Sequence, residues 1–233
     1  MSRTVPVASP KSGAGIDALS LSLVKRYQPE VLQKPMPFDI ERFFECDLED
    51  LIGVRTDYRE LAHGIHGYTD IDKMESVIAL QLMEDDSQNR FRRSTIAHEA
   101  GHVVQHVLEF RRRKEALRFI HDTEQASLKM YREQDIPLFR NPEWQAWRFA
   151  KGLLMPAASV RLAIKLGYTW RDMSEVFDVN PAFALSRLRE LRSDVCGFTL
   201  EAKAIMQAAI DLALETGDPK VLRINPTTGA SQR

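Results

Sequence analysis

Cysteine is scarce in this sequence of 233 residues, which contains only Cys46 and Cys196. Two thiols so far apart do not make the disulfide framework of a small secreted protein, so we expect both to be reduced. The first residues hold no continuous apolar stretch of the kind found in a secretory signal. No apolar run reaches the roughly 20 residues that a membrane-spanning helix needs. These absences predict a cytoplasmic protein without a membrane span.

An excess of charge of either sign is also missing. Lysine and arginine total 32 and aspartate and glutamate total 33, which gives a formal net charge of −1. Such a chain has no global basic field to attract nucleic acid or an anionic membrane, so we expect no direct DNA binding. Hydrophobic residues make up 44% and charged residues 28% of the chain, as in ordinary globular proteins.

The segment His98-Glu99-Ala100-Gly101-His102 is the feature that points to chemistry. Residues four apart share one face of an α-helix, so His98 and His102 could hold one metal ion together. Glu99 lies beside them, where its carboxylate could act as a general base toward water. The spacing therefore predicts the active site of a zinc peptidase, on a helix over residues 91–110.

Zinc in a hydrolytic site usually takes three protein ligands, so a third is expected elsewhere in the chain. Glu143 stands out among the acidic residues downstream, because it shares a face with the apolar stripe of a predicted helix over 143–154. A carboxylate at the core-facing edge of a helix needs a partner, and a metal ion would be one. The helix dipole, which favours acidic residues in a first turn, explains Glu143 equally well. The other candidates are Glu109, Glu115, Asp122, Glu124, Glu133 and Asp135.

Hydrophobic periodicity and turn residues predict an α+β fold that is mostly helical. Three short strands, read as a small antiparallel sheet, are expected just before the motif helix. Their ranges are 52–58, 67–71 and 76–83. Further helices are expected at 18–32, 40–45, 143–154, 159–166 and 199–214, and a helix-turn-helix-like pair at 169–191.

These elements predict four regions along the chain. Residues 1–16, rich in proline, glycine and small polar residues, are expected to be a disordered tail. A metallopeptidase domain is expected at 17–167 and a C-terminal helical region, which includes the helix-turn-helix-like pair, at 168–216. Residues 217–233 are expected to be a loose tail.

Two segments carry a more specific signal. Residues 93–102 read Arg-Ser-Thr-Ile-Ala-His-Glu-Ala-Gly-His, and residues 143–156 read Glu-Trp-Gln-Ala-Trp-Arg-Phe-Ala-Lys-Gly-Leu-Leu-Met-Pro. In this order they resemble the two signatures of the ImmA/IrrE-type metallopeptidases, Arg-Phe-Thr-x-Ala-His-Glu-x-Gly-His and Glu-x-Glu-Ala-Asn-x-Phe-Ala-x-x-Leu-Leu-Met-Pro. A third, weaker similarity lies at 177–188, and the resemblance covers roughly 38–191.

The resemblance implies a zincin-like core with a gluzincin-like site. One zinc ion per chain would be held by His98, His102 and Glu143, with Glu99 as the catalytic base. It also implies an intracellular endopeptidase that acts on a protein substrate. That substrate would be a helix-turn-helix repressor or a similar regulator of mobile elements, toxin–antitoxin pairs or stress responses.

The sequence departs from the family pattern at three positions. Ser94 replaces a phenylalanine, which affects packing. Gln145 replaces the second glutamate, which leaves Glu143 as the sole carboxylate of that motif. Trp147 replaces an asparagine or aspartate that could orient a metal-bound histidine, and an indole cannot accept a hydrogen bond from imidazole. The long interval between the two signatures indicates an inserted segment at 113–140.

Other residues have two interpretations each. His106 continues the face of the motif and is expected to be a neutral, hydrogen-bonded histidine rather than a second metal ligand. His63, His66, Tyr68 and Tyr131 are candidates to stabilise an oxyanion, although each is more simply a surface or packing residue. The segment 77–82 is either an exposed strand edge that could pair with a substrate or an internal strand.

Two other functions remain open on the sequence alone. The first is a non-catalytic interaction protein of a repressor or toxin–antitoxin system, which would use its C-terminal helices. The retention of Glu99 argues against it, because a structural metal site needs no base. The second is a DNA-binding regulator in which Arg187 and Arg189 of the 169–191 pair face phosphates. Without a wider basic patch we expect that pair to have a packing or protein-docking role.

Overall fold

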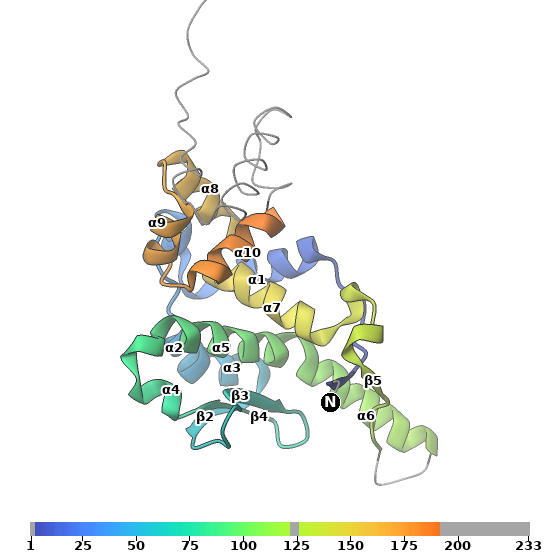
Figure 1. The fold of residues 1–233 in the computed structure, drawn as a ribbon. Coiled ribbons are helices and arrows are strands. Elements are labelled where there is room, and N and C mark those ends of the chain that lie inside the picture. Colours follow the sequence, from blue (N-terminus) through green and yellow to red (C-terminus); the bar gives the residue numbers. More distant parts are fainter. Residues whose placement is uncertain (1–2, 122–125, 192–233) are drawn as a thin grey trace, which may run out of the picture. The chain divides into compact units, whose positions relative to one another are not determined.

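Figure 1 shows the fold, a computed structural model in which residues 3–121 and 126–191 are described. These residues divide into two compact units. One contains residues 3–20, 39–121 and 126–153, and the other contains 21–38 and 154–191. The division differs from the predicted domain at 17–167, because helix α1 (Gly13–Tyr27) begins in one unit and ends in the other. The helix predicted at 199–214 and the tail predicted at 217–233 lie outside the described residues.

The N-terminal segment has regular structure. Strand β1 (Thr4–Pro6) pairs antiparallel with strand β5 (Met130–Arg132), and Val5 lies opposite Tyr131. The side chains of Val5 and Ala8 are buried, and the Ala8 amide donates to the Arg140 carbonyl at 2.9 Å. The prediction of a disordered tail over 1–16 is therefore wrong for residues 3–16. Few but well-placed apolar side chains and pairing with a distant strand order this segment.

The first unit contains a sheet of three strands, β2 (Arg55–Arg59), β3 (Gly67–Asp70) and β4 (Glu75–Ala79). Their order is β2-β4-β3, with β4 parallel to β2 and antiparallel to β3. The three predicted strands are confirmed, but the sheet is mixed rather than antiparallel. The reason is that β3 and β4 form a hairpin whose second strand inserts next to β2. All five residues of β4 are buried, so the segment 77–82 begins as an internal strand and is not an exposed edge.

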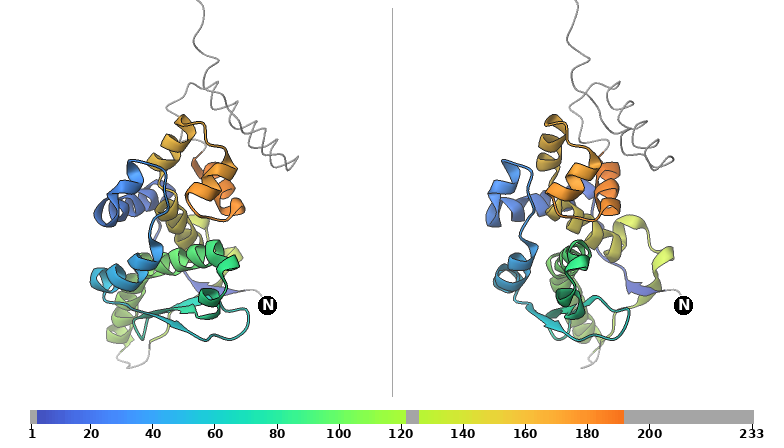
Figure 2. Two further views of the ribbon diagram at one scale, coloured as in Figure 1. Left: turned by 90° about the vertical axis from the view of Figure 1, so that its left-hand side faces the viewer. Right: turned by 60° about the vertical axis from the view of Figure 1, so that its left-hand side comes forward.

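The motif helix α5 (Asn89–His102) lies over one face of this sheet, as the two views of Figure 2 show. Its side chains Ile96, Ala97 and Ala100 are fully buried. The helix continues through a π-helical turn at Val103–Val107 into α6 (Leu108–His121). The predicted helix over 91–110 is confirmed and extends further in both directions. Before the sheet, short helical segments α2 (Ile40–Arg42) and α3 (Leu48–Ile52) flank a second π-helical turn, and α4 (Gln81–Glu84) follows β4.

Helix α7 (Pro142–Leu154) approaches α5 closely. The side chain of Asn141 accepts hydrogen bonds from the amides of Glu143 and Trp144 at 2.8 and 3.2 Å and so caps the helix. A Cβ atom on Gly101 would lie 2.9 Å from the carbonyl oxygen of Ala146. The glycine of the motif therefore allows the backbones of the two helices to come into contact, which brings Glu143 toward the histidines.

The second unit contains α8 (Ala157–Lys165), α9 (Trp170–Val176) and α10 (Pro181–Leu191). Thr169 and Asp172 form a capping box at the start of α9. Helices α9 and α10 pack together, as expected for the predicted helix pair. Arg187 is fully buried, and its Nε donates to the Met155 carbonyl at 3.0 Å. The suggestion that Arg187 faces a phosphate is therefore wrong. In the described part of the chain, no helix combines the length and apolar character needed to cross a membrane.

Candidate metal centre

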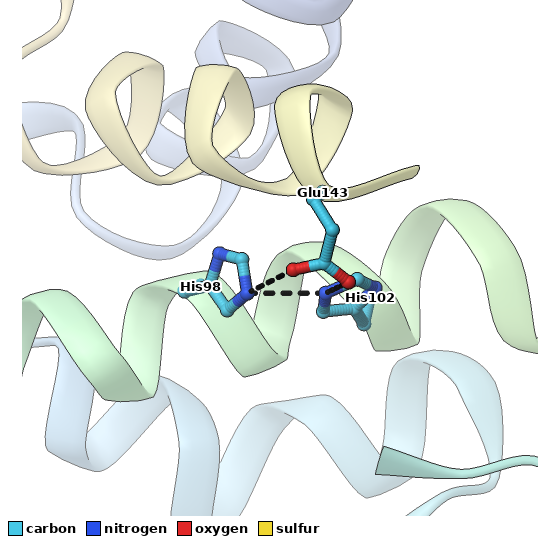
Figure 3. Close-up of side chains that lie close together, drawn as sticks. All are labelled: His98, His102 and Glu143. Atoms are coloured by element: carbon cyan, nitrogen blue, oxygen red, sulfur yellow. Dashed lines mark hydrogen bonds and ion pairs between the residues drawn. The ribbon is translucent and has the colours of Figure 1, made fainter. Parts of the chain in front are cut away.

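Three predicted ligands come together between helices α5 and α7 (Figure 3). The Nε2 atoms of His98 and His102, one helical turn apart, lie 3.1 Å from each other. The Glu143 carboxylate spans them, with Oε2 at 3.4 Å from His98 Nε2 and Oε1 at 3.4 Å from His102 Nε2. Ligand bonds of about 2.0–2.1 Å at tetrahedral angles separate ligand atoms by roughly 3.3 Å. The separation of the two nitrogens is close to one edge of such a site, and each nitrogen lies at a similar distance from one oxygen of the carboxylate.

The chemistry of this group fits a cation. Three acceptor atoms converge in a buried place, and lone pairs held this close repel one another unless a proton or a metal ion lies between them. Glu143 Oε2 has no hydrogen bond with any described residue, although it is in ion-pair contact with Arg3. The group of His98, His102 and Glu143 could thus hold a metal ion.

The titration behaviour of the three ligands is coupled. Burial opposes ionisation of Glu143, yet its contacts with His102 and His98 outweigh burial and hold its pKa well below the usual range. Burial lowers the pKa of His98, and the Glu143 carboxylate offsets only part of that effect. Burial also acts to lower the pKa of His102, but Glu143 and Glu99 outweigh it and the pKa is raised. The carboxylate is therefore ionised, as a metal ligand must be.

The candidate base Glu99 is held by the edge strand β3. The Thr69 hydroxyl donates to Glu99 Oε2 at 2.7 Å, and Thr69 is in turn 3.1 Å from the Ser76 hydroxyl. A Cβ atom on Gly67 would lie 3.0 Å from Glu99 Cγ, so this glycine leaves room for the glutamate. Glu99 is 7% exposed and lies beside the ligand group rather than within it.

A cavity of about 230 Å³ adjoins the ligand group. Its polar lining includes Glu99, His102 and Glu143, together with Thr69 of β3. Its apolar lining includes Val5, Pro6, Ile71, Val107 and Phe110. The arrangement can place an apolar side chain next to a carboxylate and a metal position.

Helix α6 and its preceding π-helical turn supply a second group of contacts. His106, 2% exposed, places Nδ1 at 3.2 Å from His102 Nδ1 and Nε2 at 2.9 Å from Gln145 Oε1. Burial, reinforced by His102 and Lys11, lowers the pKa of His106 well below its usual value. The prediction of a neutral, hydrogen-bonded His106 agrees with these contacts. Trp147 packs its ring against His98 at a centroid distance of 4.2 Å and does not replace the missing hydrogen-bond acceptor.

Sequence reasoning missed Thr69, which holds Glu99, and also Arg3. Its guanidinium lies 3.0 Å from Glu143 Oε2, and its carbonyl accepts a hydrogen bond from the Glu133 amide at 3.0 Å. A single arginine in a segment expected to be disordered gave no signal of this contact, which depends on the pairing of β1 with β5.

The remaining candidates from the sequence lie elsewhere. Of the four residues considered for oxyanion stabilisation, only Tyr68 lines the cavity, and its hydroxyl donates to Glu75 at 3.2 Å. His66 packs against Phe91. Among the other acidic candidates, Glu109, Glu115 and Glu133 contact Ser9, Arg111 and Asn141, and Asp135 lies in a 3₁₀ turn away from the cavity. Asp122 and Glu124 lie outside the described residues.

Fold and site together define an α+β protein with a buried His-His-Glu group that could hold a metal ion. Comparison of the sequence with models of known protein families finds no match, and comparison with curated proteins finds none either.

Proposed function

We propose that this protein is a zinc-dependent endopeptidase with a zincin-like core, related to the ImmA/IrrE-type metallopeptidases. The observation that carries the proposal is the convergence of His98, His102 and Glu143 beside a cavity that also contains Glu99. A structural metal site needs no carboxylate base at its side, whereas hydrolysis does. The resemblance of residues 93–102 and 143–156 to the two family signatures supports the same reaction.

Two imidazoles and one carboxylate are a common ligand set of catalytic zinc, so we propose one Zn²⁺ per chain. The bound ion would supply Lewis acidity toward a carbonyl oxygen and lower the pKa of a water molecule. Glu99, fixed by the Thr69 hydroxyl, would accept a proton from that water and pass it to the leaving amine nitrogen. Arg3, which contacts Glu143, also lines the cavity and could stabilise negative charge that develops there.

The edge strand β3 supports a peptide as the substrate. Among the residues that the structure describes, it pairs with β4 alone, and its residues Gly67 and Thr69 line the cavity. An extended chain could pair with the free side of β3 while one apolar side chain enters between Val5 and Phe110. By the family resemblance, the substrate would be a cytoplasmic helix-turn-helix repressor or a similar regulator, and α9 and α10 would serve protein docking.

Elemental analysis of the purified protein tests this proposal. We expect close to one zinc per chain in the wild type and in Glu99→Gln, and loss of zinc in His98→Ala and Glu143→Ala. Glu133→Ala, which removes a nearby carboxylate outside the ligand group, is the matched control and should retain zinc. Wild-type protein, but not Glu99→Gln, should then cleave peptides of a proteome-derived mixture. A wild type that takes up no zinc after reloading would refute the peptidase and favour a non-catalytic interaction protein.

A further inference from the structure

The side-chain amide of Gln145 has only one possible orientation. It is fully buried, and its Nε2 lies 2.9 Å from the carbonyl oxygen of Ser9 and 2.9 Å from that of Phe139. Carbonyl oxygens only accept hydrogen bonds, so the NH₂ group must face them. The Oε1 atom then faces Lys11 Nζ at 3.0 Å and His106 Nε2 at 2.9 Å. Lys11 can only donate, which independently fixes Oε1 as the acceptor.

The orientation of Gln145 determines where the protons of two histidines lie. Oε1 has no hydrogen to give, so His106 Nε2 must carry one. The His106 ring is buried, and neither of the groups that face its nitrogens, His102 and Gln145, is a carboxylate. A positive charge on the ring is therefore disfavoured, and its Nδ1 acts as an acceptor. His102 Nδ1 lies 3.2 Å from it and must therefore be the donor. The Nε2 atom of His102 is then left with its lone pair for the cation.

We propose that Gln145 and His106 are positioning residues, which hold the His102 ring in the tautomer that turns the Nε2 lone pair toward Glu143 and His98. The inference rests on the proposed zinc site, and it explains why the Nε2 atom of His102 is free to bind the cation. The hydrogen-bond chain runs from Lys11 through Gln145 and His106 to His102, and it links the N-terminal segment to the candidate metal centre. His98 has no such support, because its buried Nδ1 lacks a hydrogen-bond partner among the described residues.

The chain of contacts supports only one of the two histidines, because Trp147 packs against the other and offers it no acceptor. The second ring N–H of a metal-bound histidine normally donates a hydrogen bond to a carboxylate, carbonyl or water, and losing that partner costs about 10–100-fold in metal affinity. Trp147 cannot accept such a hydrogen bond from His98. His106 provides the acceptor for the other histidine, from the π-helical turn that follows α5.

The first test reads the tautomers directly in the wild-type protein. Long-range ¹H–¹⁵N NMR of the histidine rings at about pH 8, with the signals of residue 106 identified by their loss in His106→Asn, should show a proton on Nε2 and none on Nδ1. In the zinc-loaded protein, His102 should carry its proton on Nδ1. A proton on Nδ1 of His106 would overturn the inference, and this reading requires neither zinc nor catalytic activity.

The second test measures the zinc dissociation constant by competition with a chelator. Gln145→Met and His106→Leu should weaken binding about 10–100-fold, and His106→Asn should recover part of the loss because its amide oxygen can accept from His102. Gln105→Met is the matched control. The buried side-chain amide of Gln105 donates to the backbone carbonyl of Gln145 at 3.0 Å and does not contact the side chains of the chain of contacts. Its removal should therefore leave zinc affinity unchanged. Folded His106→Leu protein with wild-type affinity would refute the positioning role, whereas a wild type that binds no zinc would instead refute the proposed function.

Discussion

Replacing Gly101 with alanine tests whether the close approach of α5 and α7 builds the site. The added Cβ would lie 2.9 Å from the Ala146 carbonyl oxygen and 3.0 Å from Ala146 Cα. Both are backbone atoms, so neither can rotate aside. Ordinary contacts between such atoms are about 3.5–4.0 Å, and the two helices must therefore separate by roughly half an ångström.

Two effects of opposite sign decide the stability of this variant. Overpacking of a core costs about 1–3 kcal/mol, and alanine gains up to about 1 kcal/mol over glycine inside a helix. We expect a net loss of about 1 kcal/mol. Zinc affinity should fall further than stability, because metal sites tolerate ligand displacements of only about 0.2 Å. A loss of tenfold or more is expected, equivalent to about 1.4 kcal/mol.

Urea unfolding of the metal-free protein and chelator competition of the loaded protein measure the two quantities separately. Gly15→Ala is the matched control, since a Cβ at that exposed helical position meets only the Ser12 hydroxyl at 3.2 Å. That variant should be as stable as the wild type or more so, with unchanged zinc affinity. The reasoning fails if Gly101→Ala is as stable as the control Gly15→Ala and binds zinc with unchanged affinity.

Three further predictions concern the surroundings of the site. Arg3→Ala should tighten zinc binding about 2–5-fold at low salt, and less at high salt, because it removes an exposed cation that competes for Glu143. Chelator competition measures the zinc affinity, and the control Arg112→Ala should leave it unchanged. Thr69→Val should keep its zinc but lower the rate of peptide cleavage about 10–100-fold, since a hydrogen bond to a carboxylate contributes about 1.5–3 kcal/mol. Equal rates for Thr69→Val and the control Thr56→Val would contradict this prediction. The metal-free protein should lose stability as the pH falls below about 6.5, because the folded state holds the pKa of His98 and His106 below the usual 6.5 and only the unfolded chain gains their protons. The raised pKa of His102 opposes this loss, and the lowered pKa of Glu143 adds to it below about pH 4.5. Urea unfolding measures the free energy of unfolding at pH 7.5 and 5.5, and the difference between the two values should be smaller in His106→Asn than in the wild type. An unchanged difference would refute the role given to His106.

The parts of the structure that the sequence predicted well are those specified by local signals. His98, Glu99 and His102 lie within two turns of one helix, so their spacing alone places them on adjoining faces. Glu143 required more, namely the apolar stripe of its helix and the family resemblance, because its distance from the histidines is set by the packing of two helices.

The parts that were mispredicted depend on pairing between distant segments. Residues 3–16 have the composition of a loose tail, yet β1 pairs with a strand about 125 positions further along the chain. The parallel pairing of β2 with β4 likewise follows from the order of the strands in space. The residues of each strand do not predict that order. Short strands with similar composition are compatible with several registers and orders, and tertiary context selects among them.

The N-terminal segment and the candidate metal centre are joined by contacts at both ends of that segment. Arg3 contacts the ligand Glu143 directly, and Lys11 and Ser9 hold the amide of Gln145, which reaches His102 through His106. Between them, Val5 and Pro6 form one wall of the cavity. Binding of a cation to a site that the contacts of Lys11 and Ser9 support also stabilises those contacts, because metal binding and the folding of its surroundings share one free energy. The order of residues 9–11 and the affinity of the site for metal are therefore expected to rise and fall together.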